Sequence, residues 1–243
     1  MTLTVLAAGS LKRAFVPLLA RFSEQTGLHV AARFGPAGLL RERIEAGEPC
    51  SLFASANTAH PQALLAAGRA RATHTFASNR LNLTVRRTVS TATDDWLTLL
   101  ANPALTLGTS TPGCDPSGDY AWQLFDNIER ERPGLGQALK RRAKMLVGGR
   151  DTLSVPPGEM ASAWLIRQGL ADLFIGYRHY ALALDGQADL RVVEIPTRWN
   201  IRCEYQMALL DDAQATQRLA RFILGREGQT FLRDGGFSAP DVE

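Results

Sequence analysis

The stretch LTVLAAGSLKRAFVPLLARFSEQTGLHVAARFG, residues 3–35, decides the fold class. Residues 3–9 form a short apolar run typical of a buried strand, and residues 28–34 form a second one. Between them, apolar side chains recur at steps of three and one, which is the spacing of one helical face. A strand, a helix and a strand in this order predict a parallel pair joined by a crossover helix. The helical stripe consists of Leu11, Ala14, Phe15, Leu18, Leu19 and Phe22.

The ends of this first helix carry residues suited to them. Ser10 is placed to cap the N-terminus through its hydroxyl, and Gly27 is placed to end the helix. The same alternation continues to the end of the chain. Further strands are expected at 50–56, 79–87, 105–110, 171–177, 190–196 and 202–210, and further helices through 39–44 and at 60–68, 94–103, 119–134, 159–169, 211–225 and 227–237.

Two such α/β sets predict two lobes, each a mostly parallel sheet flanked by helices. Lobe I is expected to comprise residues 1–80 with 200–243, and lobe II residues 81–199. The chain therefore crosses between lobes twice. In sheets of this kind ligands sit beyond the carboxyl ends of the strands, and a cleft between lobes is a common ligand site.

The composition excludes several classes of protein. The 243 residues are 45% hydrophobic and 21% charged, with a formal net charge of +3, so a normal core can form. The densest basic cluster, KRRAK at 140–144, is interpreted as a solvated helix face, and nucleic-acid signatures are absent. Three cysteines and four histidines show no metal-ligand spacing, so no structural zinc site is expected.

The first residues, MTLTVLAAGS, already form a strand pattern and lack the basic and apolar regions of an export signal. No stretch approaches the ~20 apolar residues of a membrane span. Two alternatives stay open from the residues alone: a cytoplasmic protein, or an exported protein whose leader lies outside this sequence.

Four places combine a strand end with a helix start. They are AAGSL at 7–11, FGPAGLL at 34–40, TSTPGCDPSGDY at 109–120, and Glu159 with Tyr177. Helix N-termini carry free N–H groups and partial positive charge, so such turns suit an anion. Each also has an ordinary structural interpretation as a helix cap, a glycine turn or a core tyrosine. Neither glycine-rich turn matches a nucleotide-binding fingerprint.

Together these segments resemble a known family, the molybdate/tungstate-binding proteins of bacterial and archaeal ABC importers. The resemblance implies a two-lobed fold of the periplasmic-binding-protein type (type II) that closes on a tetrahedral oxyanion in the cleft between its lobes. It also implies a membrane permease as partner, a periplasmic location, no cofactor and no enzymatic activity. We expect a monomer that binds no nucleic acid. The resemblance rests on AAGSLKRAF, FGPAGLLRERIEAGEPCSLFASAN, ASNRLNLTV, DPSGDYAWQLF, ADLFIGYRHYA and FILGREGQTFLRDGGF.

The resemblance also implies ligand-binding residues in the first lobe. The family's first-turn serine falls on Ser10. Its second turn usually supplies a serine hydroxyl, but here the matching residues are Pro36, Ala37 and Gly38. Because proline has no N–H, only the backbone of Ala37 or Gly38 remains as donor. This departure leaves the choice between molybdate and a related anion open.

In the second lobe the resemblance implies Asp115, Ser117 and Tyr177 as ligand-binding residues, with Ser117 and Gly118 as backbone donors. Glu159 stands where bacterial members have an apolar residue, and Asp115 with Glu159 resembles the carboxylate pair of the archaeal tungstate/molybdate subgroup. There the pair ligates the Mo or W of the bound oxyanion. Carboxylates repel simple anions, so the pair is interpreted either as metal ligands or as a gate against such anions.

Three alternatives are kept. The first is a receptor for sulfate or an organic carboxylate, anchored by Arg178, Arg150 or Arg41. The second is an enzyme with Cys114 as nucleophile, which needs a base such as His179 within reach. The third is a cytoplasmic anion sensor.

Overall fold

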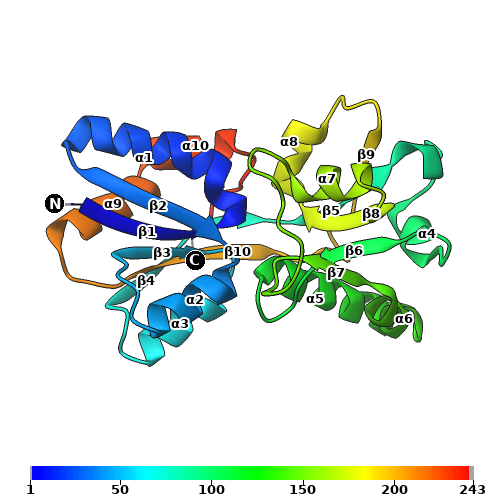
Figure 1. Ribbon diagram of the computed structural model, residues 1–243, viewed down its shortest axis with the longest axis horizontal. Helices are drawn as coiled ribbons and strands as arrows, with labels where there is room; N and C mark the ends of the chain where they lie inside the picture. The colour runs from blue at the N-terminus through cyan, green and yellow to red at the C-terminus, as the bar shows by residue number, and fades with distance from the viewer. Residues whose placement is uncertain (1, 241–243) are drawn as a thin grey trace. The chain divides into compact units, whose positions relative to one another are not determined.

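A computed structural model describes residues 2–240, and the chain divides into two compact units. We call the chain before Arg80 together with the chain from Cys203 onward the terminal unit, and Arg80–Arg202 the central unit. Each unit has one five-stranded sheet flanked by helices (Figure 1). The predicted α/β class with two lobes is confirmed.

The strands of the terminal unit are β1 (Thr2–Ala8), β2 (His29–Gly35), β3 (Leu52–Ser55), β4 (Ala72–Asn79) and β10 (Cys203–Leu209). Its helices are the 3₁₀ turn η1 (Gly9–Leu11), α1 (Lys12–Thr26), α2 (Ala37–Glu45), α3 (Ala59–Ala66), α9 (Gln214–Leu224) and α10 (Arg226–Asp234). The sheet order is β2-β1-β3-β10-β4, in which β10 alone runs antiparallel to its neighbours. Helices α1 and α10 cover one face, and α2 and α3 cover the other (Figure 1).

The strands of the central unit are β5 (Leu81–Arg86), β6 (Leu107–Ser110), β7 (Lys144–Val147), β8 (Leu173–Tyr177) and β9 (Leu190–Glu194). Its helices are η2 (Arg87–Val89), α4 (Trp96–Ala101), α5 (Pro116–Glu131), α6 (Leu135–Arg142), α7 (Ala161–Arg167), η3 (Arg178–Tyr180) and α8 (Ala181–Leu184). The order is β7-β6-β8-β5-β9, with β5 antiparallel to both neighbours. In both sheets, therefore, the antiparallel strand is the first one after a chain crossing and occupies the fourth position.

The apolar stripe of the first helix is buried as its spacing predicted. Gly27 ends α1 with φ of 69°, a left-handed conformation that glycine adopts without strain. The prediction that Ser10 caps this helix is wrong. Ser10 lies inside the turn η1, which runs directly into α1, and the N-cap of α1 is Leu11. The Ser10 hydroxyl contacts Tyr205 of the sheet instead.

Two strands, β4 and β7, were not predicted from the sequence. Strand β4 has the polar sequence ATHTFASN and becomes a strand by pairing with β10 along its length. Strand β7 is only four residues long and lies at the sheet edge, where Lys144 and Met145 are exposed. Strand β4 has no apolar run, and the apolar run of β7 is only three residues long, so neighbouring strands rather than local pattern hold both in place.

Candidate functional site

Each turn that the sequence singled out in front of a helix follows the carboxyl end of a strand. In the terminal unit β1 and β2 are parallel neighbours, and Ala8 pairs with Gly35 at their ends. In the central unit β6 is parallel to both β7 and β8. Because parallel strands end at the same edge, each sheet collects its own turns at one edge.

Ser10 is nearly buried beside the sheet of the terminal unit. Its Oγ lies 2.9 Å from the hydroxyl of Tyr205, a fully buried residue of β10, and either oxygen can be the donor. A serine hydroxyl has one proton and two acceptor sites. When Tyr205 donates, the proton of Ser10 points elsewhere, so the pair can orient Ser10 toward an acceptor such as an oxyanion.

Ala37 and Gly38 form the first turn of α2, directly after Pro36. Leu40 N donates to Pro36 O at 2.9 Å, which is the first hydrogen bond of the helix. The N–H groups of Ala37 and Gly38 precede that bond and therefore have no acceptor within the helix. A Cβ on Gly35 would lie 3.5 Å from the side chain of Leu40, an ordinary van der Waals contact, so packing against Leu40 does not require glycine there.

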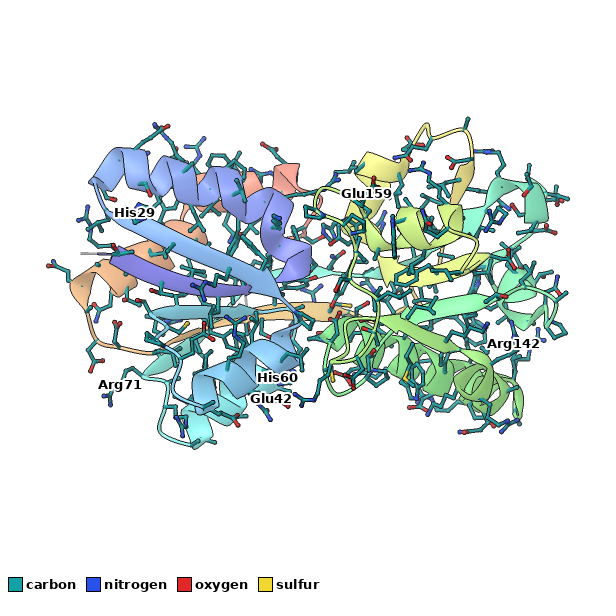
Figure 2. All side chains as sticks on the ribbon, viewed as in Figure 1. His29, Glu42, His60, Arg71, Arg142 and Glu159 are labelled. Carbon is teal, nitrogen blue, oxygen red and sulfur yellow. The ribbon has the colours of Figure 1, made fainter. Side chains whose placement is uncertain are left out.

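A third turn of the terminal unit, after β3, was missed by the sequence reasoning. Ser55 Oγ donates to Asn57 Oδ1 at 2.8 Å, and the same oxygen accepts from the N–H of His60 at 3.2 Å. The imidazole of His60 is 8% exposed, and neither ring nitrogen has a hydrogen-bond partner among residues 2–240. Burial, aided by the charge of Arg41, lowers its pKa to about 4 (Figure 2). The ring is therefore neutral at pH 7.

In the central unit, Asp115 is the N-cap of α5. Its Oδ1 accepts from Ser117 N at 3.2 Å, and its Oδ2 accepts from the hydroxyl of Ser110 at 2.7 Å. Burial raises the pKa of the Asp115 carboxyl above its ordinary value, while the hydrogen bonds from Ser110 and Ser117 act in the opposite direction. Both carboxylate oxygens thus already have partners in the protein.

The same turn uses the two backbone donors that were expected to meet the ligand. Ser117 N donates to Asp115 Oδ1, and Gly118 N donates to Asp115 O at 3.0 Å. Gly118 is required by packing instead: a Cβ there would lie 2.5 Å from backbone atoms of Thr111 and Pro112. The first turn of α5 is therefore pressed against the end of β6.

A glycine pair after β7 completes this region and was also missed. Gly148 has φ of 76°, and a Cβ on it would lie 2.0 Å from Ser110 Oγ and 2.6 Å from Asp115 Oδ2. Thr111 Oγ1 donates to Val147 O at 2.8 Å. We call the meeting of Ser110, Thr111, Asp115 and Gly148 the α5 cradle. The signal for it in the sequence was the GG pair following an apolar run.

Tyr177 ends β8 and is 5% exposed. Its ring contacts Tyr120 of α5 edge-on, with centroids 6.3 Å apart and an interplanar angle of 74°. Because Tyr120 lies just over one turn beyond Asp115, this contact joins Tyr177 to the first part of α5. Of the predicted residues in the central unit, Asp115, Ser117 and Tyr177 are thus associated with one helix.

Glu159 is exposed and lies in the segment before α7, where its N–H donates to Pro156 O at 3.1 Å (Figure 2). Its charge contributes to raising the pKa of Arg167, whose main partner is Asp189. Among residues 2–240, no group of three or more His, Cys, Asp or Glu side chains could hold a metal ion. A pairing of Glu159 with Asp115 on the metal of an oxyanion stays a prediction.

Several residues named in the alternatives have structural partners. Arg178 pairs with Glu194 at 3.2 Å, and Arg41 pairs with Glu45 at 2.9 Å. Both arginines are therefore already neutralised by a carboxylate of the chain itself.

The basic cluster at 140–144 also has structural contacts. Lys140 pairs with Asp126 at 2.6 Å, and Arg142 donates to the carbonyl oxygens of Leu100 and Asn102 at 2.9 and 3.0 Å. Arg142 thereby satisfies acceptors at the C-terminal end of α4. The positions of the Lys140 and Arg142 side chains are thus explained by contacts within the chain, and no nucleic-acid partner is needed to explain them.

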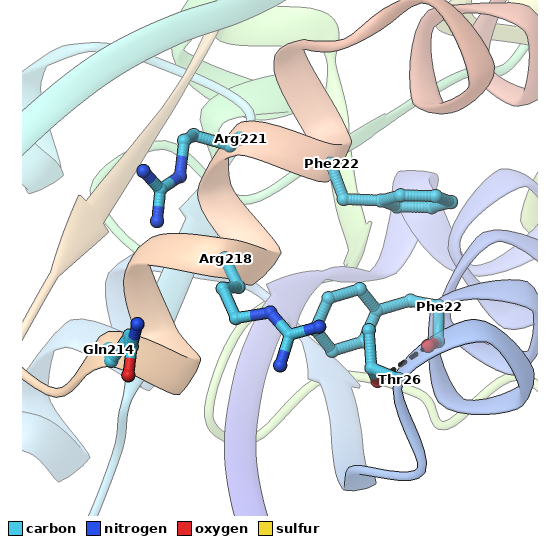
Figure 3. Close-up of a pocket in the computed structure, with 6 residues that line it drawn as sticks. All are labelled: Phe22, Thr26, Gln214, Arg218, Arg221 and Phe222. Atoms are coloured by element: carbon cyan, nitrogen blue, oxygen red, sulfur yellow. Dashed lines mark hydrogen bonds between the residues drawn. The ribbon is translucent and has the colours of Figure 1, made fainter.

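A separate hollow of about 510 Å³ lies on the terminal unit between α1 and α9. Figure 3 shows the rings of Phe22 and Phe222 on one side and the guanidinium groups of Arg218 and Arg221 on the other. None of the residues predicted to bind ligand lines it. It is open to solvent and unrelated to the strand-end turns.

With the fold and these turns established, the class of the protein follows from comparison with known families. Residues 3–238 match the model of the bacterial extracellular solute-binding proteins, and the chain belongs to that family. It is similar to an uncharacterised protein of Pasteurella multocida strain Pm70, with 44% identity over 238 residues that cover 96% of this chain and 97% of the relative.

Solved structures share the fold at low sequence identity. The periplasmic molybdate-binding protein of Azotobacter vinelandii is 20% identical with a TM-score of 0.76, over 98% of this chain and all of that one. The sulfate-binding protein SubI of Mycobacterium tuberculosis H37Rv is 17% identical with a TM-score of 0.77, over 99% of this chain and 88% of that one. At these identities the likeness establishes the fold, and the proteins compared are binding proteins rather than enzymes.

Proposed function

We propose that this protein is the solute-binding component of an ABC importer and that it binds molybdate or tungstate. The observation that carries the proposal is the pair of helix N-termini, α2 and α5, each at the carboxyl edge of its sheet beside a buried serine. Both ends supply partial positive charge without a proton that can be lost, which suits an anion. At α2 the N–H groups of Ala37 and Gly38 have no acceptor within the helix, whereas at α5 those of Ser117 and Gly118 donate to Asp115.

In the terminal unit, the donors proposed for the oxyanion are the hydroxyl of Ser10 and the N–H groups of Ala37 and Gly38. The contact with Tyr205 supports the role of Ser10, because Tyr205 can donate to the Ser10 oxygen and leave the Ser10 proton for the ligand. The position of Ala37 and Gly38 ahead of the first helical hydrogen bond supports their role as donors.

In the central unit, the donors proposed are the hydroxyls of Ser117 and Tyr177. The N–H of Ser117 is used by Asp115, so the side chain is the group left to contribute. Tyr177 is held through its ring against Tyr120. Both hydroxyls are neutral donors, which suits a tetrahedral anion.

The carboxylates of Asp115 and Glu159 would repel an anion. Two like charges 4 Å apart repel each other by about 1 kcal/mol in water and by several times that where less water is present. A high-valent Mo or W centre, in contrast, accepts hard oxygen ligands. The two carboxylates are therefore proposed either to ligate the metal or to exclude simple anions. Either role favours molybdate and tungstate over sulfate and phosphate.

Isothermal titration calorimetry of the ligand-free protein with tungstate, molybdate, sulfate and phosphate tests the proposal. Tungstate and molybdate are expected to bind at least about a hundredfold tighter than the other two, a difference of about 3 kcal/mol. A protein that binds none of the four would contradict the proposal. The double variant Asp115→Ala/Glu159→Ala is expected to lose this selectivity, and unchanged tungstate affinity would remove both carboxylates from the site.

A sulfate receptor is the second candidate. The lack of a hydroxyl in the turn Pro36-Ala37-Gly38 departs from the molybdate family, and the sulfate-binding protein SubI has the same fold. Sulfate binding tighter than tungstate in the same titrations would select this candidate.

The proposed location is the periplasm and the proposed partner is a membrane permease. Membership of the extracellular solute-binding family supports both. Between residues 2 and 240, none of the helices has the length and apolar character required to cross a membrane.

A further inference from the structure

The side chain of Asn200 joins two distant parts of the central unit through four hydrogen bonds. Its Oδ1 accepts from Leu81 N at 3.0 Å and from Ile201 N at 2.8 Å. Its Nδ2 donates to Leu81 O at 2.8 Å and to Ile195 O at 3.2 Å. Asn200 therefore binds both backbone polar groups of Leu81, much as a neighbouring strand would.

The segment that carries Asn200 is itself held firmly. Pro196 O accepts from the N–H groups of both Trp199 and Asn200, at 2.9 and 3.1 Å, which closes a tight turn. The ring of Trp199 packs edge-on against Trp96 with centroids 5.4 Å apart. Asn127 Nδ2 donates to Trp199 O at 2.8 Å. A fixed turn thus presents the Asn200 amide to Leu81.

The contact between Asn200 and Leu81 lies next to both chain connections between the units. In the terminal unit, the last pair of the β4–β10 ladder is Asn79 with Cys203. In the central unit, the side chain of Asn200 binds the backbone of Leu81 and so joins the same two stretches of chain. Both chain connections between the units therefore lie between these two pairs, and Arg80 O already accepts from Arg178 N at 2.7 Å within the central unit.

We propose that Asn200 is a positioning residue that fixes where the two connections bend. Its side chain ties Leu81, at the start of β5, to the segment that leads back to the terminal unit. A change in the orientation of the units is then confined to the residues between 79 and 81 on one connection and between 200 and 203 on the other. The inference rests on the proposed function, because a binding protein that closes on its ligand needs a defined pivot.

The amide is specifically suited to this role. Leu81 offers one donor and one acceptor, and only a side chain with both kinds of group satisfies them together. Aspartate would keep the two accepted bonds but would place its carboxylate against the carbonyl oxygens of Leu81 and Ile195. The test therefore compares Asn200→Ala, Asn200→Asp and the milder Asn200→Ser with Asn127→Ala, which removes an amide bond to Trp199 and leaves Leu81 untouched.

Hydrogen exchange of the ligand-free protein, followed by mass spectrometry on peptides spanning 79–83, is the first measurement. Asn200→Ala and Asn200→Ser are expected to speed exchange there at least about tenfold, the loss of roughly one net hydrogen bond. Asn200→Asp keeps an acceptor for Leu81 N and is expected to speed exchange less. Asn127→Ala is expected to leave it unchanged. Wild-type exchange rates in a folded Asn200→Ser or Asn200→Ala protein would overturn the inference.

Calorimetry with tungstate is the second measurement. Without the Asn200 contact, more open arrangements are populated and the apparent affinity is expected to fall about three- to tenfold, with Asn127→Ala unaffected. Equal affinities in all variants would overturn the role in closure. If the wild-type protein bound none of tungstate, molybdate, sulfate and phosphate, the proposed function would be refuted. The exchange measurement needs no ligand and would still test the Asn200 contact.

Discussion

The buried imidazole of His60 predicts how the stability of this protein depends on pH. In an unfolded chain the pKa of the ring is 6.5, and in the folded protein burial lowers it to about 4. The nearby guanidinium of Arg41 acts in the same direction, and only Glu42 opposes it. Between these two pKa values the unfolded chain binds a proton that the folded protein does not. The contribution of His60 to the free energy of unfolding therefore falls as the pH drops below about 6.5 and levels off below about 4.

The size of the effect follows from the two pKa values. Between pH 7 and pH 5, protonation of the unfolded chain lowers the free energy of unfolding by about 2 kcal/mol, and solvent screening near the ring reduces this toward about 1 kcal/mol. The variant His60→Leu removes the titrating group at similar volume. It is expected to lack this part of the pH dependence and to be at least as stable as the wild type at pH 7, because neither ring nitrogen has a hydrogen-bond partner among residues 2–240.

Urea unfolding at pH 7, 6 and 5, followed by circular dichroism, measures the free energy of unfolding at each pH. The matched control is His74→Leu, at an exposed position of β4, which is expected to keep the wild-type pH dependence. If His60→Leu lost as much stability as the wild type between pH 7 and pH 5, the assignment of this effect to His60 would be refuted.

Three further sets of substitutions test the turns. Asp115→Ala is expected to cost about 1 kcal/mol of stability through loss of the α5 cap, and Asp115→Asn much less, in urea unfolding. Gly148→Ala combines a strained φ with a clash on Ser110 and is expected to cost more than about 2 kcal/mol; Gly158→Ala, with φ of 84° and no atom within 4 Å, is expected to cost only about 1 kcal/mol. In a double-mutant cycle of Ser10→Ala with Tyr205→Phe, a coupling free energy of about 1 kcal/mol is expected in unfolding. A value near zero would show that their hydrogen bond does not stabilise the protein.

The fold class could be predicted because local patterns and tertiary packing agree along most of the chain. The stripe from Leu11 to Phe22 has the helical period, and the same residues form the buried face of α1. Gly27 marks the helix end in the sequence and adopts the left-handed conformation that only glycine takes without strain. Strands β4 and β7 could not be predicted in this way, because their partners, not their own side chains, make them strands.

The candidate site was predictable only in outline. Ser10, Ala37, Asp115 and Tyr177 could be selected because each stands where a strand ends or a helix begins. What their side chains touch could not be read from spacing. Tyr205, the partner of Ser10, is 195 positions away along the chain.

By itself, the sequence determined the alternation of strands and helices, the turns at which strands end and helices begin, and the α/β fold class. Hydrophobic periodicity and turn residues depend on neighbours along the chain, so they can be read directly from the sequence. Only the tertiary structure decided that Asp115 caps α5 and bonds Ser110, that Gly148 must lack a side chain because it lies against both, and that Asn200 binds Leu81. Each of these depends on atoms that meet only after distant segments pack together, and no spacing along the chain records such a meeting.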